Sequence, residues 1–230
     1  MNLLAFDTST EHLSIALSWP GQGAGGPASH RGAGGAQASA SLIPAIESLL
    51  VAAGLKVREL DAIVFGRGPG SFTGLRTACS VAQGLAFGSG VPLLPVDTLL
   101  AVAEDARDKA GATRVVAVLD ARMDEVYSAR YELDAGRWHR RTEPALWRPE
   151  SLAVPAGWTL AGNAAAAYAG RLPDGIEALP DALALLRVAP ALLADGHATD
   201  AAGAIPLYVR DKVAQTTEER ARSRAAADRP

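Results

Sequence analysis

The chain has 230 residues, of which 49% are hydrophobic, and a formal net charge of −3. This length allows one large domain or two smaller lobes, each with its own core. The acidic balance excludes the dense basic face of a protein that binds nucleic acid alone, and the single cysteine excludes a disulfide framework and a two-cysteine metal motif. A reducing compartment, the cytoplasm, is therefore the expected location.

The N-terminal residues, MNLLAFDTST, reach Asp7 after few apolar residues and carry no basic leader, which is unlike a signal peptide. No stretch approaches the roughly 20 uninterrupted apolar residues of a membrane-spanning helix, so we expect no membrane contact. Residues 3–6 are predicted as a strand that ends in the polar DTST turn, and the alternation over 13–17 predicts a second strand in a hairpin. Residues 21–35, rich in Gly, Ala and Ser, predict a flexible hairpin and loop.

Strands and helices alternate over the next part of the chain. Apolar residues at helical spacing predict a helix over 41–53 that ends at Gly54. The following elements are predicted as a strand at 62–65, a loop at 66–70, a helix at 72–87 capped by Ser71, a strand at 91–96 and a helix at 98–110 capped by Asp97. This alternation is typical of a layered α/β fold.

The pattern restarts near Gly111, because a strand at 115–119 ends in Asp120 as the first strand ends in Asp7. Further elements are predicted as strands at 126–133 and 138–147 around a turn at 134–136, a strand at 158–161 and a helix at 182–194. The restart is a faint internal repeat. We predict an N-terminal lobe over 1–110 completed by 200–215, a C-terminal lobe over 111–199, and a disordered tail over 216–230.

The most informative run is GRGPGSFTGLR at residues 66–76, between a predicted strand and a predicted helix. Its glycines permit a backbone turn with positive φ, and the start of the following helix can receive an anion. It is not a Walker A loop, because no Gly-Lys-Ser/Thr follows, and Thr73 stands where a dinucleotide fingerprint has its third glycine. From the residues alone, a structural turn and a ligand site both remain open.

Together with DTST at 7–10, DARMDEVY at 120–127 and PLYVR at 206–210, this run resembles the bacterial TsaB family, also called YeaZ, in order over nearly the whole chain. The resemblance implies two ribonuclease H-like lobes of the actin, hexokinase and Hsp70 superfamily. It implies a non-catalytic subunit that binds and stabilises TsaD and cooperates with the ATPase TsaE. The assembly attaches threonylcarbamoyl to the adenosine beside the anticodon of tRNAs that read codons beginning with A. ATP is used by the assembly, and no cofactor is implied for this subunit.

The resemblance also implies a possible nucleotide or anion site, because the superfamily holds phosphates at a strand-end aspartate beside Thr and Ser. Its candidate residues are Asp7, Thr8, Thr10, Gly68, Gly70 and Ser71. The alternative is that Asp7 only hydrogen-bonds its own turn. Similarly, Asp120 and Arg122 can form an internal ion pair.

Catalytic relatives are expected to hold a metal through two histidines one helical turn apart at the start of the first helix. Residues 37–41 here read QASAS, and the four histidines of the chain are scattered singly. Because a metal site needs three or four converging ligands, we expect no metal and no catalytic residue. Ser71 and Thr73 lack a nearby base and a nucleophile elbow, which disfavours a glycoprotease-like peptidase.

The family resemblance implies that the first two helices pack against the same pair in TsaD as a four-helix bundle, or against a second copy of the chain when TsaD is absent. The expected contact residues are Leu42, Ile46, Leu49, Phe72, Leu75, Ala78 and Ala82. An apolar patch of this kind can equally be core, and that alternative remains open. A nucleotide-binding ATPase or kinase of the same superfamily is the other function left open.

Overall fold

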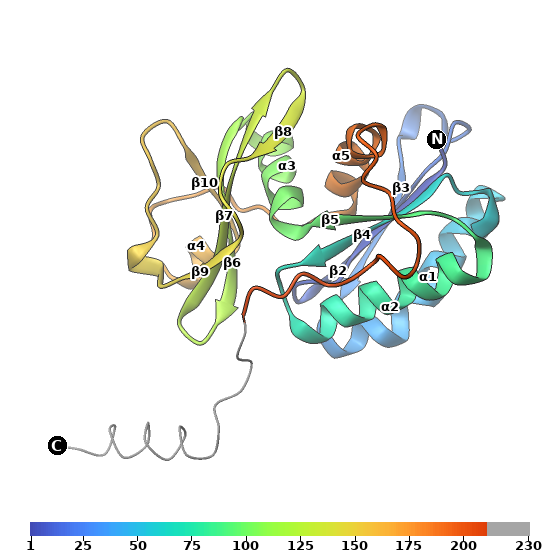
Figure 1. The fold of residues 1–230 in the computed structure, drawn as a ribbon, viewed down its shortest axis with the longest axis horizontal. Helices are drawn as coiled ribbons and strands as arrows, with labels where there is room; N and C mark the ends of the chain where they lie inside the picture. The colour runs from blue at the N-terminus through green and yellow to red at the C-terminus, as the bar shows by residue number, and fades with distance from the viewer. Residues whose placement is uncertain (211–230) are drawn as a thin grey trace, which may run out of the picture.

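Two five-stranded sheets organise residues 1–210, which are the residues that the computed structural model describes (Figure 1). The first sheet has the order β3-β2-β1-β4-β5, and its strands are β1 (Leu3–Asp7), β2 (His12–Ser18), β3 (Ala28–Ala33), β4 (Ala62–Gly68) and β5 (Leu93–Asp97). The second has the order β10-β6-β7-β8 with β9 also on β7, and its strands are β6 (Arg114–Arg122), β7 (Glu125–Asp134), β8 (Arg137–Arg140), β9 (Ala145–Trp147) and β10 (Thr159–Gly162).

The two sheets begin in the same way. Strand β1 pairs antiparallel with β2 and parallel with β4, while β6 pairs antiparallel with β7 and parallel with β10. Asp7 ends β1, and Asp120 lies near the end of β6. The faint repeat in the sequence therefore corresponds to a shared topology, and the predicted two-lobed α/β architecture is confirmed.

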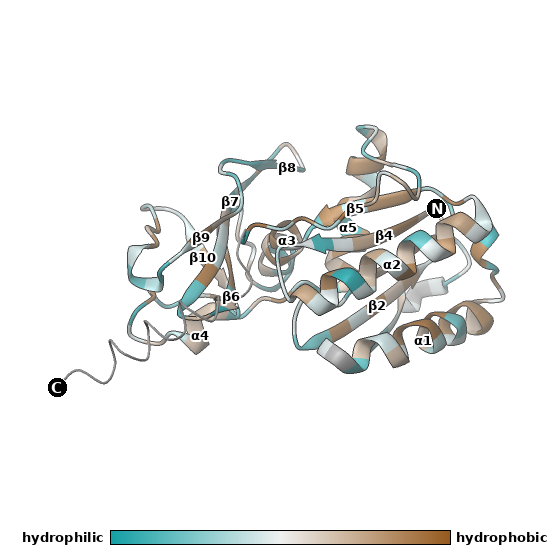
Figure 2. Ribbon diagram, turned by 60° about the horizontal axis from the view of Figure 1, so that its bottom comes forward, coloured by the Kyte–Doolittle hydropathy of each residue, from teal (hydrophilic) through white to brown (hydrophobic). Residues whose placement is uncertain are grey.

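Helices cover both faces of the first sheet, as the alternation of side chains along its strands requires. On one face lie α1 (Ala38–Ala53) and α2 (Phe72–Ser89), which share a core with Leu4, Phe6 and Phe65 (Figure 2). On the other lie α3 (Thr98–Ala110) and α5 (Ala182–Ala194), which share a core with Leu3, Ala5 and Val64. A short helix, α4 (Ala164–Ala167), packs on the second sheet.

Helix α3 lies between the two lobes (Figure 1). Every residue from Thr98 to Ala106 is buried, which is expected of a helix covered on all sides. One continuous hydrophobic cluster includes residues of the first sheet, α3, α5 and the second sheet. The lobes are thus joined through a shared apolar core and not only through the chain that connects them.

The position of α5 corrects the predicted lobe boundary. Residues 182–194 were assigned to the C-terminal lobe, yet α5 packs on β1, β2 and β4 of the first sheet. The reason is that the open face of that sheet needs an apolar cover, and Leu185, Val188 and Ala189 supply it. Residues 211–215 of the predicted completing segment and the predicted tail at 216–230 lie outside the described residues.

Two further expectations about the strands are corrected. The segment predicted as a flexible hairpin and loop contains β3, an edge strand that pairs with β2 over six residues although most of its side chains are exposed. The strand predicted at 138–147 is divided into β8 and β9. In both places backbone pairing, and not a buried face, defines the strand. Within residues 1–210, no helix has the length and apolar character needed to span a bilayer.

Candidate functional site: the interlobe cleft and the exposed helix pair

A cleft of about 730 Å³ lies between the lobes. The first lobe contributes residues 9–11, 35 and 69–72 with Leu75 and Arg76, and the second contributes residues 119–123 with Tyr127 and Asn163. The segment 207–210 forms a further part of the lining. Residues from DTST, GRGPGSFTGLR, DARMDEVY and PLYVR therefore meet at this one place.

Asp7 lies beneath this cleft and does not line it. Its side chain is 1% exposed, and Oδ1 accepts hydrogen bonds from the Ser9 backbone N–H (2.8 Å) and hydroxyl (2.6 Å). Oδ2 has no hydrogen-bond partner among residues 1–210 and points at Gly66, where an added Cβ would overlap it. Burial raises the pKa of Asp7 to about 7 although both bonds from Ser9 lower it. The turn-forming role of Asp7 is confirmed.

Only three of the six predicted nucleotide or anion residues line the cleft, namely Thr10, Gly70 and Ser71. Thr8 is fully buried and donates its hydroxyl hydrogen to the Gly74 carbonyl at 2.7 Å. Gly68 has φ +119°, and an added Cβ would lie 2.6 Å from the Leu207 carbonyl oxygen. Asp7, Thr8 and Gly68 are therefore corrected from ligand candidates to residues that build the turn.

Two acidic residues line the cleft, Glu11 of the first lobe and Asp120 of the second. Asp120 forms the predicted ion pair with Arg122 at 3.1 Å, and its Oδ1 also accepts from the Tyr168 hydroxyl at 2.9 Å. Its backbone N–H donates to Asn163. These contacts occupy Asp120 from several sides, so it is held as part of the β6–β7 turn.

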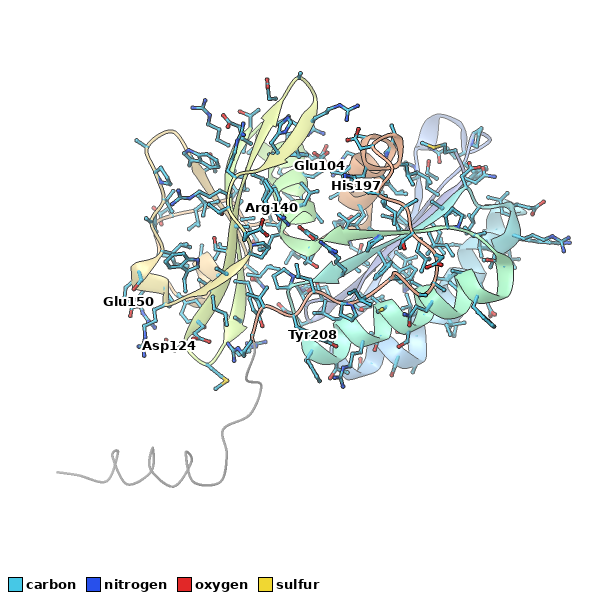
Figure 3. The ribbon with its side chains drawn as sticks, viewed as in Figure 1. Glu104, Asp124, Arg140, Glu150, His197 and Tyr208 are labelled. Carbon is cyan, nitrogen blue, oxygen red and sulfur yellow. The ribbon has the colours of Figure 1, made fainter. Side chains whose placement is uncertain are left out.

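An arginine and two aromatic side chains form a cluster in the lining of the cleft. The Arg76 guanidinium carbon is 3.7 Å from the centre of the Phe72 ring, and Arg76 Nε donates to the Tyr208 hydroxyl at 3.1 Å. The two rings are 5.4 Å apart, and Tyr208 lies next to the first turn of α2 (Figure 3). This cluster joins the C-terminal segment to α2.

Most of the side chains expected to contact a partner are instead in the core of the first lobe. Leu42, Ile46, Leu75, Ala78 and Ala82 are each at most 2% exposed. Leu42, Ile46, Ala78 and Ala82 pack toward the sheet because they form the apolar stripes of α1 and α2, whereas the buried Leu75 lies at the cleft. The prediction is corrected for these five, while Leu49 is half-buried and Phe72 is exposed.

The outward faces of α1 and α2 carry different residues. Val51 is 80% exposed and Phe87 is 89% exposed, at the C-terminal ends of the two helices. Ile43 is also exposed, two helical turns before Val51. Along α2 the exposed positions between Phe72 and Phe87 include the small residues Thr73, Ser80 and Gly84. Glu47 of α1 and Arg76 of α2 are exposed in the same rows, so each helix also presents one charge. The small residues permit the close approach of another helix.

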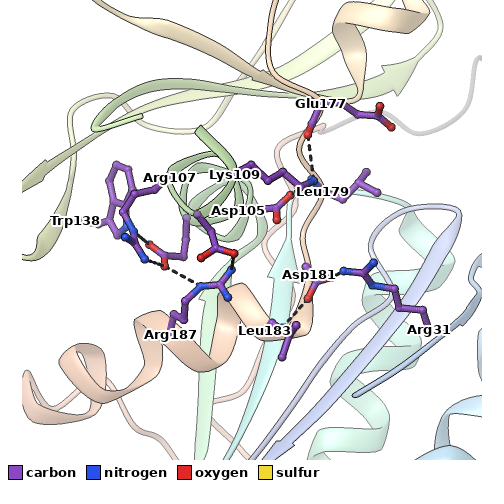
Figure 4. Close-up of polar contacts among 12 residues, drawn as sticks. Arg31, Asp105, Arg107, Lys109, Trp138, Glu177, Leu179, Asp181, Leu183 and Arg187 are labelled. Carbon is purple, nitrogen blue, oxygen red and sulfur yellow. Dashed lines mark hydrogen bonds and ion pairs between the residues drawn. The ribbon is translucent and has the colours of Figure 1, made fainter. Parts of the chain in front are cut away.

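A buried polar centre holds the lobes together behind the cleft (Figure 4). Glu104 of α3 is 3% exposed and accepts hydrogen bonds from Arg107 and from Trp138 of β8 and Arg187 of α5. Burial alone would raise the pKa of Glu104, but the bonds from Arg107 and Trp138 lower it. Asp97 similarly pairs with Arg67 at 2.8 Å and Arg140 at 2.9 Å (Figure 3). The sequence analysis did not predict this centre. Its one signal in the sequence is the presence of charged residues within the otherwise apolar helix α3.

Metal ligands do not converge in residues 1–210, where no group of three His, Cys, Asp or Glu side chains could hold an ion. Cys79 is buried in α2, and its thiol donates to the Ala204 carbonyl at 3.1 Å. The strand-end aspartate of the first lobe, Asp7, is covered by Gly66 and bonded to Ser9.

Comparison with known proteins agrees with this architecture. Residues 34–223 match the family model described as TsaD, tRNA N6-adenosine threonylcarbamoyltransferase. The tRNA threonylcarbamoyladenosine biosynthesis protein TsaB of Escherichia coli (strain K12) is 36% identical over 227 residues, which cover 93% of this chain and 96% of that protein. The chain belongs to the TsaB family.

Other TsaB-family proteins extend the match. TsaB of Haemophilus influenzae is 34% identical over 236 residues, covering 93% of this chain and 95% of that protein. The solved structure of YeaZ from Pseudomonas aeruginosa has a TM-score of 0.82 and 41% identity, and covers 90% of this chain and 99% of that one. The four motifs that carry the family resemblance in the sequence contribute residues to the cleft.

Proposed function

We propose that this chain is a non-catalytic subunit in tRNA threonylcarbamoyladenosine biosynthesis, where it binds and stabilises a TsaD-like transferase and cooperates with a TsaE-like ATPase. Its E. coli and H. influenzae relatives are named for this biosynthesis. The proposed setting is the cytoplasm, with tRNA as substrate of the complex. The subunit itself requires no cofactor.

The exposed helix pair is the observation that carries this proposal. Val51 and Phe87 are mostly exposed on neighbouring helices, and burying them against a partner would remove about 1.5–3 kcal/mol of unfavourable hydration each. The small residues of α2 between Phe72 and Phe87 allow a partner helix to approach the backbone. The proposed contact set is therefore Ile43, Leu49, Val51, Phe72 and Phe87, with Thr73, Ser80 and Gly84 between them.

The same face suits a second copy of this chain when the transferase is absent, because an isologous contact uses one patch twice. Homodimer and heterodimer then compete for one surface. Dilution should favour whichever complex has the lower dissociation constant.

Two features speak against the nucleotide-binding ATPase or kinase. Asp7 is buried away from the cleft, so its carboxylate cannot approach a phosphate-bound cation. The lobes are also joined by one continuous core through α3, which opposes the closure around ligand that such enzymes use.

Charge placed on the proposed face tests the function. We expect Val51→Glu and Phe87→Glu to weaken binding to a TsaD-like partner at least about tenfold, since each would bury an unpaired charge. Trp147→Glu is the matched control, because Trp147 is 44% exposed but lies on β9 of the second lobe. Titration calorimetry gives the three dissociation constants. Unchanged binding in both helix variants would overturn the proposed interface. Ala82→Glu is a poorer test because Ala82 is buried in the core.

A further inference from the structure

The segment 204–210, named the clasp here, runs along α2 and ends on the second lobe (Figure 1). At its start, the Ala204 carbonyl accepts hydrogen bonds from the Cys79 thiol and the Gln83 side chain of α2. Further along, Tyr208 accepts from Arg76 and stacks near Phe72. The clasp is therefore bound along residues 204–208 to α2, the helix that carries part of the proposed partner-binding face.

The other end of the clasp is fastened by Arg210, whose side chain is 13% exposed. Its Nη2 donates to the Ala121 carbonyl at 3.1 Å and to Glu125 Oε2 at 2.7 Å, and its Nη1 lies 2.8 Å from the Met123 sulfur. A planar guanidinium can make these contacts at once, whereas an ammonium group cannot. Arg210 thus holds both sides of the β6–β7 turn.

That turn has an unfavourable backbone. Arg122, Met123 and Asp124 are consecutive non-glycine residues with φ of 60°, 55° and 63°. Side chains in this left-handed region are disfavoured, so such a conformation persists only when surrounding contacts determine it. Asp124 is held by Arg171, Arg122 by Asp120, and the carbonyl side of the turn by Arg210.

The middle of the clasp lies directly on β4. The Leu207 N–H donates to the Arg67 carbonyl at 2.7 Å, and an added Cβ at position 68 would lie only 2.6 Å from the Leu207 carbonyl oxygen. Gly68 also has φ +119°, which favours glycine. Position 68 therefore sets how closely the clasp approaches the sheet.

We propose that the clasp couples the first turn of α2 to the β6–β7 turn, with Arg210 as the positioning residue, so that a change at one end alters the other. The coupling follows from contiguous contacts: α2 to Tyr208, Leu207 to β4, and Arg210 to the turn. It predicts that loosening either end increases opening at both. Its link to partner binding rests on the proposed function, but the coupling itself does not.

Hydrogen exchange on the full chain tests this, with one variant at the Arg210 end of the clasp and one beneath its middle. Arg210→Gln removes the guanidinium contacts with the β6–β7 turn. The backbone amides of 72–76 and of 121–125 should then both exchange about tenfold faster. Gly68→Ala should displace Leu207 and accelerate exchange in 121–125, although the three atoms nearest to an added Cβ at position 68 belong to Leu207 and Leu75. Arg58→Gln is the control, because Arg58 is exposed and makes none of the clasp contacts described above.

Purely local effects would overturn the proposed coupling. In that outcome, both variants would show faster hydrogen exchange near the substituted residue and unchanged exchange at the distant end of the clasp. Arg210→Lys keeps the charge without the fork and provides a milder variant, expected to give the same pattern at lower amplitude. A final arm adds a TsaD-like partner, which should slow exchange in 121–125 of the wild type more than in Arg210→Gln. Absence of partner binding in this arm would contradict the proposed function and leave the exchange result of the isolated chain decisive for the clasp.

Discussion

The two lobes place an aspartate at the end of their first strand, and the two carboxylates have opposite environments. Asp7 is 1% exposed, one of its oxygens has no partner among residues 1–210, and burial raises its pKa to about 7. Asp120 lines the cleft and is bound by Arg122 and Tyr168. The same topology therefore contains one carboxylate that is buried and one that is paired at the cleft. The residues around each strand end, and not the fold, determine the chemistry of its aspartate.

The largest expected difference is in pH dependence. The pKa of Asp7 is raised from 3.8 to about 7, so the folded state binds this proton more tightly than the unfolded state. The resulting stabilisation is fully present below about pH 4 and is lost as the pH rises through about 7, a change of about 4 kcal/mol at most. Urea denaturation from pH 4 to 8 should show this decline, and Asp7→Asn should flatten it. An equally steep decline in Asp7→Asn would show that other groups cause it.

The seal over Asp7 can be tested by adding one methyl group. Gly66→Ala places a Cβ on Asp7 Oδ2, and the overlap inside a buried sheet should cost about 3 kcal/mol. Gly84→Ala is the matched control, since its site is open and alanine favours a helix by about 1 kcal/mol. Denaturant midpoints of both variants measure the contrast. Wild-type stability in Gly66→Ala would mean that the carboxylate can move aside.

The smallest expected effect concerns the paired carboxylate. Tyr168→Phe removes the hydroxyl that donates to Asp120 at 2.9 Å, which should cost about 1 kcal/mol. Ser9→Ala is the corresponding deletion at Asp7, and it should in addition raise the pKa of Asp7 because the Ser9 hydroxyl lowers it. NMR titration of the Asp7 carboxyl in Ser9→Ala and in Tyr168→Phe separates the two sites. A shift of the Asp7 titration in Tyr168→Phe would contradict their independence.

The sequence predicted the helices better than their surfaces. The helices at 98–110 and 182–194 are confirmed at both ends, because apolar periodicity and Gly111 act locally. The predicted cap residue Asp97 does precede the first of them, but its side chain makes no capping bond and pairs with Arg67 and Arg140 instead. Strand β3 was missed because an exposed edge strand has no buried face to produce alternation. The contact residues that the family resemblance implies include Leu42, Ile46 and Ala82, which belong to the regular apolar stripe of each helix, and that stripe is the part that the sheet of the first lobe buries. Exposed Val51 and Phe87 could be distinguished from it only once the sheet was placed.

The candidate site was predictable in its location but not in its roles. The motifs at 7–10, 66–76, 120–127 and 206–210 converge on the cleft, yet Asp7 lies below its floor. Whether a strand-end carboxylate faces solvent depends on residues distant in sequence, here Gly66 against Asp7 and Tyr168 beside Asp120. The conformational propensities of the residues around a strand end do not specify which distant residues will pack against its carboxylate.

The most direct test of the proposed function is reconstitution of tRNA threonylcarbamoylation with purified TsaD-like and TsaE-like proteins, ATP and tRNA. We predict modified adenosine only when this chain is added, none from this chain alone, and a strongly reduced yield with Phe87→Glu while Trp147→Glu supports the normal yield. Full modification in the absence of this chain, or modification by this chain without the transferase, would contradict the assignment as a required, non-catalytic subunit.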